Sequence, residues 1–470
     1  MAQEFNAKEW FFFPAIIGLL LYIAAQVYKR NRLYSVLKLP PCYSGWMPFL
    51  GCAIEFGKEP LNFIEKMHRK LGPVYTLYIG GKRMTYLTDE EDYNKYFMQS
   101  QHVDFQKAVH LFVANAASIP SESFLTHHTS IHDLMKGKLA TNQLPSHSKD
   151  LQTQFERRLA EISLAGSCEL NEVIRLIMYP SVIRNLFGED VLPIHNEESM
   201  NKLMVNFVAF DDQFEYGTQI PHVFIRKWAQ SKQWLLNVFR KAILQIKSTD
   251  DTVLKSLYEM VDKEHGANYS LLMLWASLAN AIPITFWTVA MILNDPKVHE
   301  RVIKEISAAQ DSSGNIEYNT ATFEKLKYIR CCFLEAIRIR SPGVITRMVV
   351  KSFNVKGYNV PAGDLLFLSP HWTHRNEKYF PDAEKYMPER WLTCDFTKNE
   401  FLPGFVAFGG GRYMCPGRWY AIMELHMIIT MLFHKYSMTL ESTLPKANVM
   451  HLVGVQQPDA DCYVRFSPKL

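Results

Sequence analysis

Apolar residues recur three and four positions apart along most of the chain, which is the spacing of one face of an α-helix. One such segment begins with Asp295 and Pro296, a favoured N-cap residue followed by a proline at the first helical position. The pattern predicts helices over residues 61–71, 89–101, 152–162, 271–293 and 296–309.

Alternating apolar residues, typical of strands, occur in two short regions. The stretch PVYTLYIGGKRMTYLT predicts a hairpin with a Gly-Gly turn. The stretch MVVKSFNVKGYNVPAGDLLFLS alternates in the same way and is broken at Lys356-Gly357 and Ala362-Gly363. No internal repeat or low-complexity segment follows residue 50, so the expected body is one large, mainly α domain with small β-sheets.

The N-terminus has a different pattern. Residues 10–28, WFFFPAIIGLLLYIAAQVY, carry no charge, and these nineteen residues are long enough to cross a bilayer core. More positive charge follows this run than precedes it, which predicts that the body faces the cytosol. No cleavage site is evident, so an uncleaved signal anchor is expected. The predicted divisions are a lumenal segment 1–9, a single-pass anchor 10–28, a basic and proline-rich linker 29–49, and a catalytic domain 50–470.

Composition and charge exclude several classes of protein. A net charge of +4 without a dense Lys/Arg block argues against a nucleic-acid partner. The eight cysteines show no CxxC spacing, which argues against a zinc site or a thioredoxin-like motif.

Glu335 and Arg338 lie three residues apart in CCFLEAIRIRSP and share one face of a predicted helix. Apolar neighbours indicate that this pair is interior. A second arginine, Arg390, occurs in YMPERW. A buried glutamate shared by two arginines predicts a structural role rather than a catalytic one.

The stretch FVAFGGGRYMCPGRWYA places three glycines ahead of Cys415 and a predicted helix from about Arg418. Backbone N–H groups at a helix N-terminus stabilise a thiolate, which is the reactive form of cysteine. A phosphate loop is excluded because no Gly-Lys-Ser/Thr follows the glycines, and a dinucleotide turn because no GxGxxG occurs.

Three motifs in this order and spacing resemble the cytochrome P450 family: Glu335-x-x-Arg338, Pro388-Glu389-Arg390-Trp391, and Phe408-x-x-Gly411-x-x-x-Cys415-x-Gly417. The resemblance covers essentially the whole chain, and the anchor with its proline-rich linker is similar to microsomal members. It implies a P450 fold and a haem b whose iron is ligated by the Cys415 thiolate, the ligand type that favours O–O cleavage.

The same resemblance implies residues that bind the haem propionates. Arg347 falls where a propionate ligand is usual in the family. Arg412 is expected in a similar role, because Tyr413 occupies the usual basic position two residues before the cysteine. Lys136 and Lys138 follow the stretch 128–132, where the family often has Trp-x-x-x-Arg and this chain has neither residue.

The long predicted helix reads WASLANAIPITFW, with Ala279-Asn280 where oxygen-activating members usually carry an acid–alcohol pair. Pro283 has no N–H, so the Ala279 carbonyl loses its helical partner and the helix is expected to kink or open. A simple packing kink is one interpretation. The other is that Asn280 and the freed Ala279 carbonyl organise the oxygen or substrate site.

The helix pattern ASxANxxPxxFW is similar to a branch of the family with sterol and oxysterol hydroxylases and prostacyclin synthase. This resemblance implies hydroxylation of an oxysterol, with 24-hydroxycholesterol at its 7α position expected, in cholesterol catabolism and bile-acid synthesis. It also implies a location in the endoplasmic reticulum membrane and electrons from NADPH through NADPH–cytochrome P450 reductase. The stretches that carry it are FDDQFEYGTQIP, LLMLWASLANAIPITFW, SPGVITRMVVK and HLVGVQQP.

Three alternatives stay open from the sequence: another sterol hydroxylase, a haem-thiolate isomerase of the prostacyclin-synthase type, and a catalytically silent membrane-tethered sterol-binding protein. Residues 210–241 mix aromatic and basic residues, which suits either contact with membrane lipid or an ordinary amphipathic surface. The substrate pocket is expected around residues 103–119, 275–286, 342–346 and 452–457.

Overall fold

The computed structural model describes residues 37–89, 91, 93, 101–162, 164–189, 192–194, 196–247 and 250–469. The predicted anchor, the basic part of the linker and most of the predicted helix 89–101 lie outside these residues.

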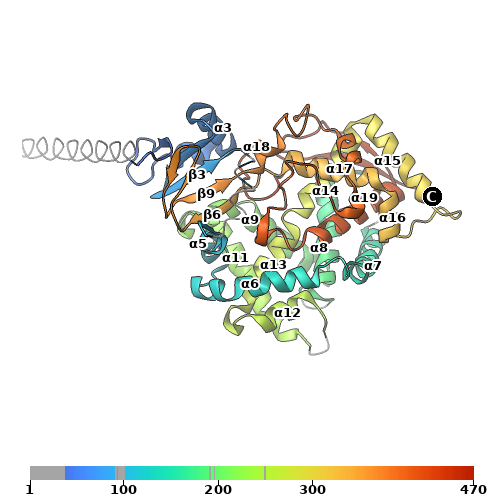
Figure 1. Cartoon of the computed structure of the whole chain (residues 1–470). Helices are drawn as coiled ribbons and strands as arrows, with labels where there is room; N and C mark the ends of the chain where they lie inside the picture. The colour runs from blue at the N-terminus through green and yellow to red at the C-terminus, as the bar shows by residue number, and fades with distance from the viewer. Residues whose placement is uncertain are drawn as a thin grey trace, which may run out of the picture.

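Helices make up most of the described chain (Figure 1). The long ones are α3 (Pro60–Leu71), α5 (Phe105–Ala117), α6 (Ser121–Lys138), α7 (Leu144–Ile162), α8 (Leu170–Phe187), α9 (Glu197–Asp211), α11 (Arg226–Ala242), α13 (Gly266–Leu278), α14 (Ala281–Asn294), α15 (Pro296–Ala309), α17 (Lys327–Arg340) and α19 (Arg418–Lys435). Shorter ones are α2 (Ala53–Lys58), α10 (Phe214–Gly217), α12 (Val253–Met260), α16 (Thr320–Lys325), α18 (Pro370–His374) and the 3₁₀ turns η1 (His222–Phe224), η4 (Pro388–Thr393) and η6 (Gly411–Tyr413). The expectation of a mainly α-helical protein is confirmed.

Helix α15 shows how local sequence sets a boundary. It begins at Pro296, as predicted, and the Asp295 side chain accepts hydrogen bonds from the backbone N–H groups of Lys297 and Val298 at 3.0 and 3.3 Å. These bonds satisfy N–H groups that have no partner inside the helix.

Strands from residues 42–104 and 345–368 form a six-stranded sheet at one end of the molecule (Figure 1). The predicted hairpin is present: β2 (Val74–Ile79) pairs antiparallel with β3 (Lys82–Leu87) through Gly80 and Gly81, both at positive φ. The order is β1 (Cys42–Tyr43), β2, β3, β9 (Leu365–Leu368), β6 (Ile345–Val349) and β4 (Val103–Asp104). Separate sheets pair β7 (Phe353–Val355) with β8 (Tyr358–Val360), and β11 (Tyr463–Pro468) with β10 (Tyr436–Leu440) and β5 (Gly166–Glu169).

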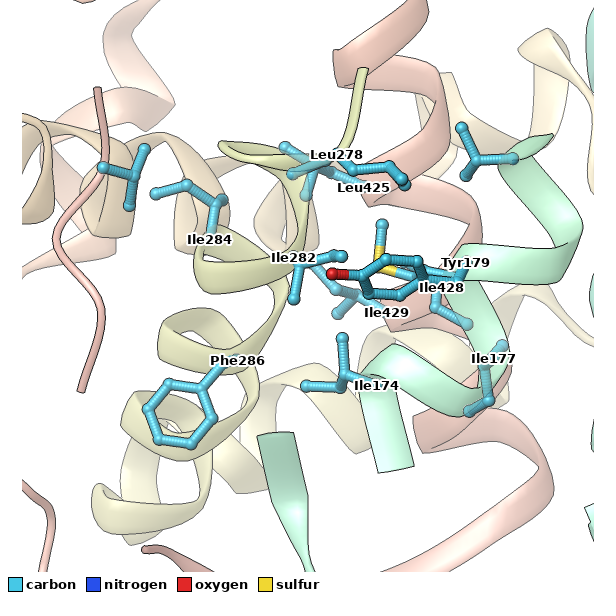
Figure 2. Close-up of a cluster of buried hydrophobic side chains, with 14 of the residues drawn as sticks. Ile174, Ile177, Tyr179, Leu278, Ile282, Ile284, Phe286, Leu425, Ile428 and Ile429 are labelled. Carbon is cyan, nitrogen blue, oxygen red and sulfur yellow. The ribbon is translucent and has the colours of Figure 1, made fainter. Parts of the chain in front are cut away.

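The central core forms where α8, α14 and α19 meet (Figure 2). Ile174 of α8, Ile282 of α14 and Ile428 of α19 approach one another there and are at most 3% exposed. Helix α14 is apolar on all sides because other helices surround it. This packing fixes α14, the helix that follows the expected oxygen site at Ala279 and Asn280.

The long predicted helix 271–293 is interrupted. Helix α13 ends at Leu278 and α14 begins at Ala281, so Ala279 and Asn280 lie between two helices. Pro283 falls in the first turn of α14, where a missing N–H breaks no intrahelical bond. The expected opening of the helix is confirmed.

Within the described residues, the stretch Lys263–Asn294 is the one with the length and hydropathy of a membrane span. In its most apolar window 78% of the residues are buried inside the protein, which is typical of core helices.

Replacing Ile428 by Ala would remove buried methyl groups at the contact of three helices. We expect a loss of about 2–5 kcal/mol, measured as a lower midpoint of thermal unfolding. Val205→Ala is the matched control, because Val205 on α9 is 66% exposed and should leave the midpoint nearly unchanged. Equal midpoints for the two variants would contradict this account of the core.

Candidate active site

The cysteine loop precedes α19. Gly409 and Gly411 have φ of +73° and +67°, in the region that favours glycine. The backbone N–H of Cys415 donates to the Phe408 carbonyl at 2.9 Å. These features close the loop and hold the Cys415 sulfur at the N-terminus of the helix, which begins at Arg418 as predicted.

Two effects act on the Cys415 thiol. Burial is the larger effect and leaves the pKa of the thiol raised, while the N–H groups of Gly417 and Arg418 and the charge of Arg418 act to lower it. The N–H groups thus favour the thiolate, the form that binds a metal. Gly417 itself lies close to α6, because a Cβ there would be 3.6 Å from Leu139 Cδ1.

The surroundings of the loop fit a haem. A Cβ built on Gly409 would meet no atom within 4 Å, so the backbone there borders open space. Arg347 of β6 is 4% exposed, and burial lowers the pKa of its guanidinium to about 10, which means that an anion beside it would be favourable. A thiolate donor, a bare glycine loop and a buried cation are the groups that a haem with propionates requires.

Histidines that sequence reasoning did not single out lie near this arginine. Tyr413 stacks on Phe105 with ring centroids 4.8 Å apart, and Arg347 lies 4.8 Å from the same Phe105 ring. The His128 ring is 5.4 Å from Tyr413, and His132 Nε2 is 3.1 Å from the Met414 carbonyl. The available signal was His128-x-x-x-His132, which stands where the family has Trp-x-x-x-Arg.

The other basic residues considered as propionate ligands are not buried as Arg347 is. Arg412 is exposed, with its guanidinium 5.8 Å from the Tyr413 ring. Lys136 is exposed, and Lys138 pairs with Asp251 at 2.7 Å.

Glu335, Arg338 and Arg390 are brought together in the interior. Arg338 donates to both Glu335 carboxylate oxygens at 2.8 and 2.9 Å, and Arg390 Nε donates at 3.0 Å. Trp391 Nε1 and the Met387 backbone N–H donate to the same carboxylate at 2.9 and 3.0 Å. Five bonds therefore converge on one fully buried carboxylate, joining α17 to η4.

This ion-pair cluster reaches the cysteine loop through His374. Arg338 donates to the His374 carbonyl at 2.6 Å, and His374 Nε2 accepts from the Val406 backbone N–H at 3.1 Å. The Nδ1–H of His374 must then donate to the Arg338 carbonyl, 3.0 Å away. Burial lowers the pKa of His374 well below its ordinary value, which keeps the ring neutral.

At the helix interruption, Asn280 is oriented by a distant loop. Its Oδ1 accepts from the Val455 backbone N–H at 3.0 Å. A Cβ on Gly454 would lie 2.2 Å from that oxygen, so glycine is required there. Asn280 Nδ2 makes no hydrogen bond with the described part of the chain. The amide therefore has a fixed orientation and an available donor, and Ala279 beside it is buried.

The four stretches that carry the sterol-branch resemblance meet around the loop 451–458. Glu215 Oε1 accepts from the backbone N–H groups of Leu452 and Val453 at 3.0 and 2.9 Å. Val344 N–H donates to the Leu452 carbonyl at 3.1 Å, and Trp287 Nε1 to the Gln456 carbonyl at 2.7 Å. Segments far apart in sequence thus form one site.

The cytochrome P450 family model matches residues 40–464, and the chain therefore belongs to the cytochrome P450 family. It is a haem-dependent monooxygenase of this family.

Individual members of the family are similar to this chain over nearly its whole length. The chain is 40% identical over 446 residues to the human "24-hydroxycholesterol 7-alpha-hydroxylase", covering 92% of this chain and 95% of that protein. The mouse protein of the same name is 40% identical over 449 residues, with 93% and 95% covered. Mouse "Cytochrome P450 7B1" is 25% identical over 493 residues, with 97% and 96% covered.

Among solved structures, the retinoic acid bound cyanobacterial CYP120A1 matches with a TM-score of 0.74. The match covers 92% of this chain and 99% of that one at 19% identity, so it shows the fold alone.

Glu335→Gln would remove the charge that two buried guanidinium groups share. We expect a loss of about 3–5 kcal/mol and a lower haem content in the purified protein, because the cluster also supports the cysteine loop. Glu384→Gln is the control: Glu384 is 75% exposed and pairs with Arg375 at 3.1 Å. Wild-type thermal stability and haem content in Glu335→Gln would refute the supporting role.

Proposed function

We propose that this protein hydroxylates oxysterols, with 24-hydroxycholesterol as substrate and the 7α position as the site of reaction. The observation that carries the proposal is the 40% identity to two proteins of that printed activity, extending over more than nine-tenths of each chain. The convergence of the four resemblance stretches on one site supports it, because these stretches are the expected determinants of substrate choice.

In this proposal Cys415 ligates the iron of haem b, and Arg347 binds a propionate, with Arg412 nearby on the surface. Phe408, Gly411 and Gly417 would shape the loop that holds the haem. The haem, when bound, supplies reductive O₂ activation: one oxygen atom enters a sterol C–H bond, and the other leaves as water with two electrons and two protons from outside.

Asn280 and Ala279 take the place of the usual acid–alcohol pair. The Val455 N–H fixes Asn280 Oδ1, so Nδ2 is the end of the amide that can donate to a water molecule or a sterol oxygen. A water molecule held by Nδ2 and the Ala279 carbonyl would carry protons in place of a carboxylate.

We further propose that residues 10–28 anchor the protein in the endoplasmic reticulum membrane, with residues 1–9 lumenal, 29–49 a linker and 50–470 a cytosolic haem-thiolate domain. Exposed apolar side chains support membrane contact. Trp46 and Phe49 are 82% and 69% exposed, and Phe224 of η1 is 76% exposed. Tyr216 of α10, which precedes η1, donates through Oη to the Gly57 carbonyl of α2 at 3.3 Å. This bond joins the segment that follows Trp46 and Phe49 to the segment that precedes Phe224. NADPH–cytochrome P450 reductase is the proposed electron donor.

The proposal is tested by reconstituting the full chain with reductase, NADPH and O₂, and by mass spectrometry of products from a set of side-chain oxysterols. A 7α-hydroxylated product from 24-hydroxycholesterol is expected, and Cys415→Ser should abolish it together with the thiolate band of the carbon monoxide spectrum. Turnover without NADPH or O₂ would indicate an isomerase, and a wild-type protein without the thiolate band would indicate a silent binding protein.

Asn280→Ala removes the free amide donor at the helix interruption. We expect the fraction of NADPH consumption that appears as hydroxylated sterol to fall by about tenfold, because proton delivery would be less well oriented. Ser277→Ala is the control, since the Ser277 hydroxyl bonds within α13 to the Leu274 carbonyl at 2.9 Å. Unchanged turnover and coupling in Asn280→Ala would remove this residue from the mechanism.

A further inference from the structure

A polar cluster without an assigned role lies between α9, α13 and the loop 451–458. Asp211, at the end of α9, accepts from Trp275 Nε1 at 2.8 Å through one carboxylate oxygen. Its other oxygen accepts from Gln457 Nε2 at 3.3 Å. Asp211 is 5% exposed and Gln457 is 8% exposed, so the cluster is interior.

The chemistry of Asp211 decides how the Gln457 amide points. Burial raises the pKa of this carboxyl to about 6, which leaves it mostly ionised at neutral pH. An ionised carboxylate only accepts hydrogen bonds, so the NH₂ end of the Gln457 amide must face it. The amide oxygen, Oε1, is therefore turned to the other side.

That oxygen has no partner in the described part of the chain, although it is buried. A buried acceptor without a donor costs free energy, so such an atom calls for an explanation. The neighbouring carboxylate of Glu215 is different, because two backbone N–H groups satisfy it.

The cluster lies close to the proposed reaction site. The Trp275 carbonyl accepts from the backbone N–H of Ala279, the neighbour of Asn280, at 3.0 Å. The loop that carries Gln457 also binds Asn280 through Val455. Phe214 stacks on Trp275 with centroids 4.0 Å apart and an interplanar angle of 6°, so an apolar aromatic wall adjoins the Asp211 side of the cluster.

We propose that Gln457 Oε1 accepts a hydrogen bond from a hydroxyl group of the sterol substrate, and that Asp211, held by Trp275, positions the Gln457 amide. This inference rests on the proposed function and deepens it. A sterol is an apolar body with few hydroxyl groups, which suits an apolar site with one buried acceptor. Such an acceptor strongly disfavours a ligand that lacks the hydroxyl, whereas an apolar wall does not.

The test measures the equilibrium binding of three sterols to the haem-loaded full chain. Binding is detected as the change in haem absorption that each sterol induces. The sterols are 24-hydroxycholesterol, cholesterol, which lacks the side-chain hydroxyl, and the 3-deoxy analogue of 24-hydroxycholesterol. Gln457→Leu should weaken binding by about tenfold for each sterol that carries the recognised hydroxyl and leave the sterol without it unaffected. An unaffected cholesterol identifies the side-chain hydroxyl, and an unaffected 3-deoxy analogue identifies the 3β-hydroxyl.

Two further variants separate recognition from folding. Trp275→Phe keeps the stack on Phe214 and removes the N–H that holds Asp211, so a smaller loss with the same sterol selectivity is expected. Gln456→Leu is the matched control: Gln456 is also buried, and its amide donates to the Asn448 carbonyl at 3.3 Å. It should change affinity for the three sterols equally or not at all. Haem content and the unfolding midpoint are measured for every variant.

Equal losses for all three sterols in Gln457→Leu, or no loss, would overturn the proposal and assign Oε1 to a structural water. Sterol binding and product formation are measured separately, so that this proposal and the proposed function can fail independently. A wild-type enzyme that shows the hydroxyl preference but forms no 7α product would contradict the proposed function and leave this recognition role standing.

Discussion

The buried Glu335 carboxylate is the constraint on which the cluster of residues behind the cysteine loop depends. Two guanidinium groups, an indole N–H and a backbone N–H converge on it, so its negative charge is compensated without water. Arg338 extends the network to the His374 carbonyl, and His374 accepts from Val406 at the start of the cysteine loop. The cysteine loop is therefore connected to this ion-pair cluster through His374.

A second constraint acts where the loop 451–458 closes against the interrupted helix. The loop binds Asn280, Glu215, Trp287 and Val344 through its backbone, and Gly454 allows the close approach to Asn280. Opening the helix exposes backbone and an amide, and the loop fixes the amide in one orientation. The interruption is thus tied to the loop by a specific hydrogen bond at Asn280.

The sequence predicted the Glu335 cluster and the helix interruption, but it did not predict every residue near the cysteine loop. Glu335 and Arg338 lie three residues apart on one helix, so local periodicity was sufficient to pair them, and the Asp295 cap and the Gly80-Gly81 hairpin are local in the same sense. The interruption before Pro283 followed from the chemistry of a single residue. The histidines of α6 were missed because their partner, Tyr413, lies in another part of the chain.

By itself the sequence determined the mainly helical class, the helix and hairpin boundaries that depend on neighbouring residues, and the haem-thiolate loop, since each rests on backbone preferences or on spacing within a few residues. The tertiary structure alone decided that Asn280 is held by Val455, 175 positions away, and that Gln457 meets Asp211 across 246 positions. Periodicity carries no information about contacts between segments so distant, because the packing of intervening helices creates them. The site proposed to select a substrate is made of such contacts.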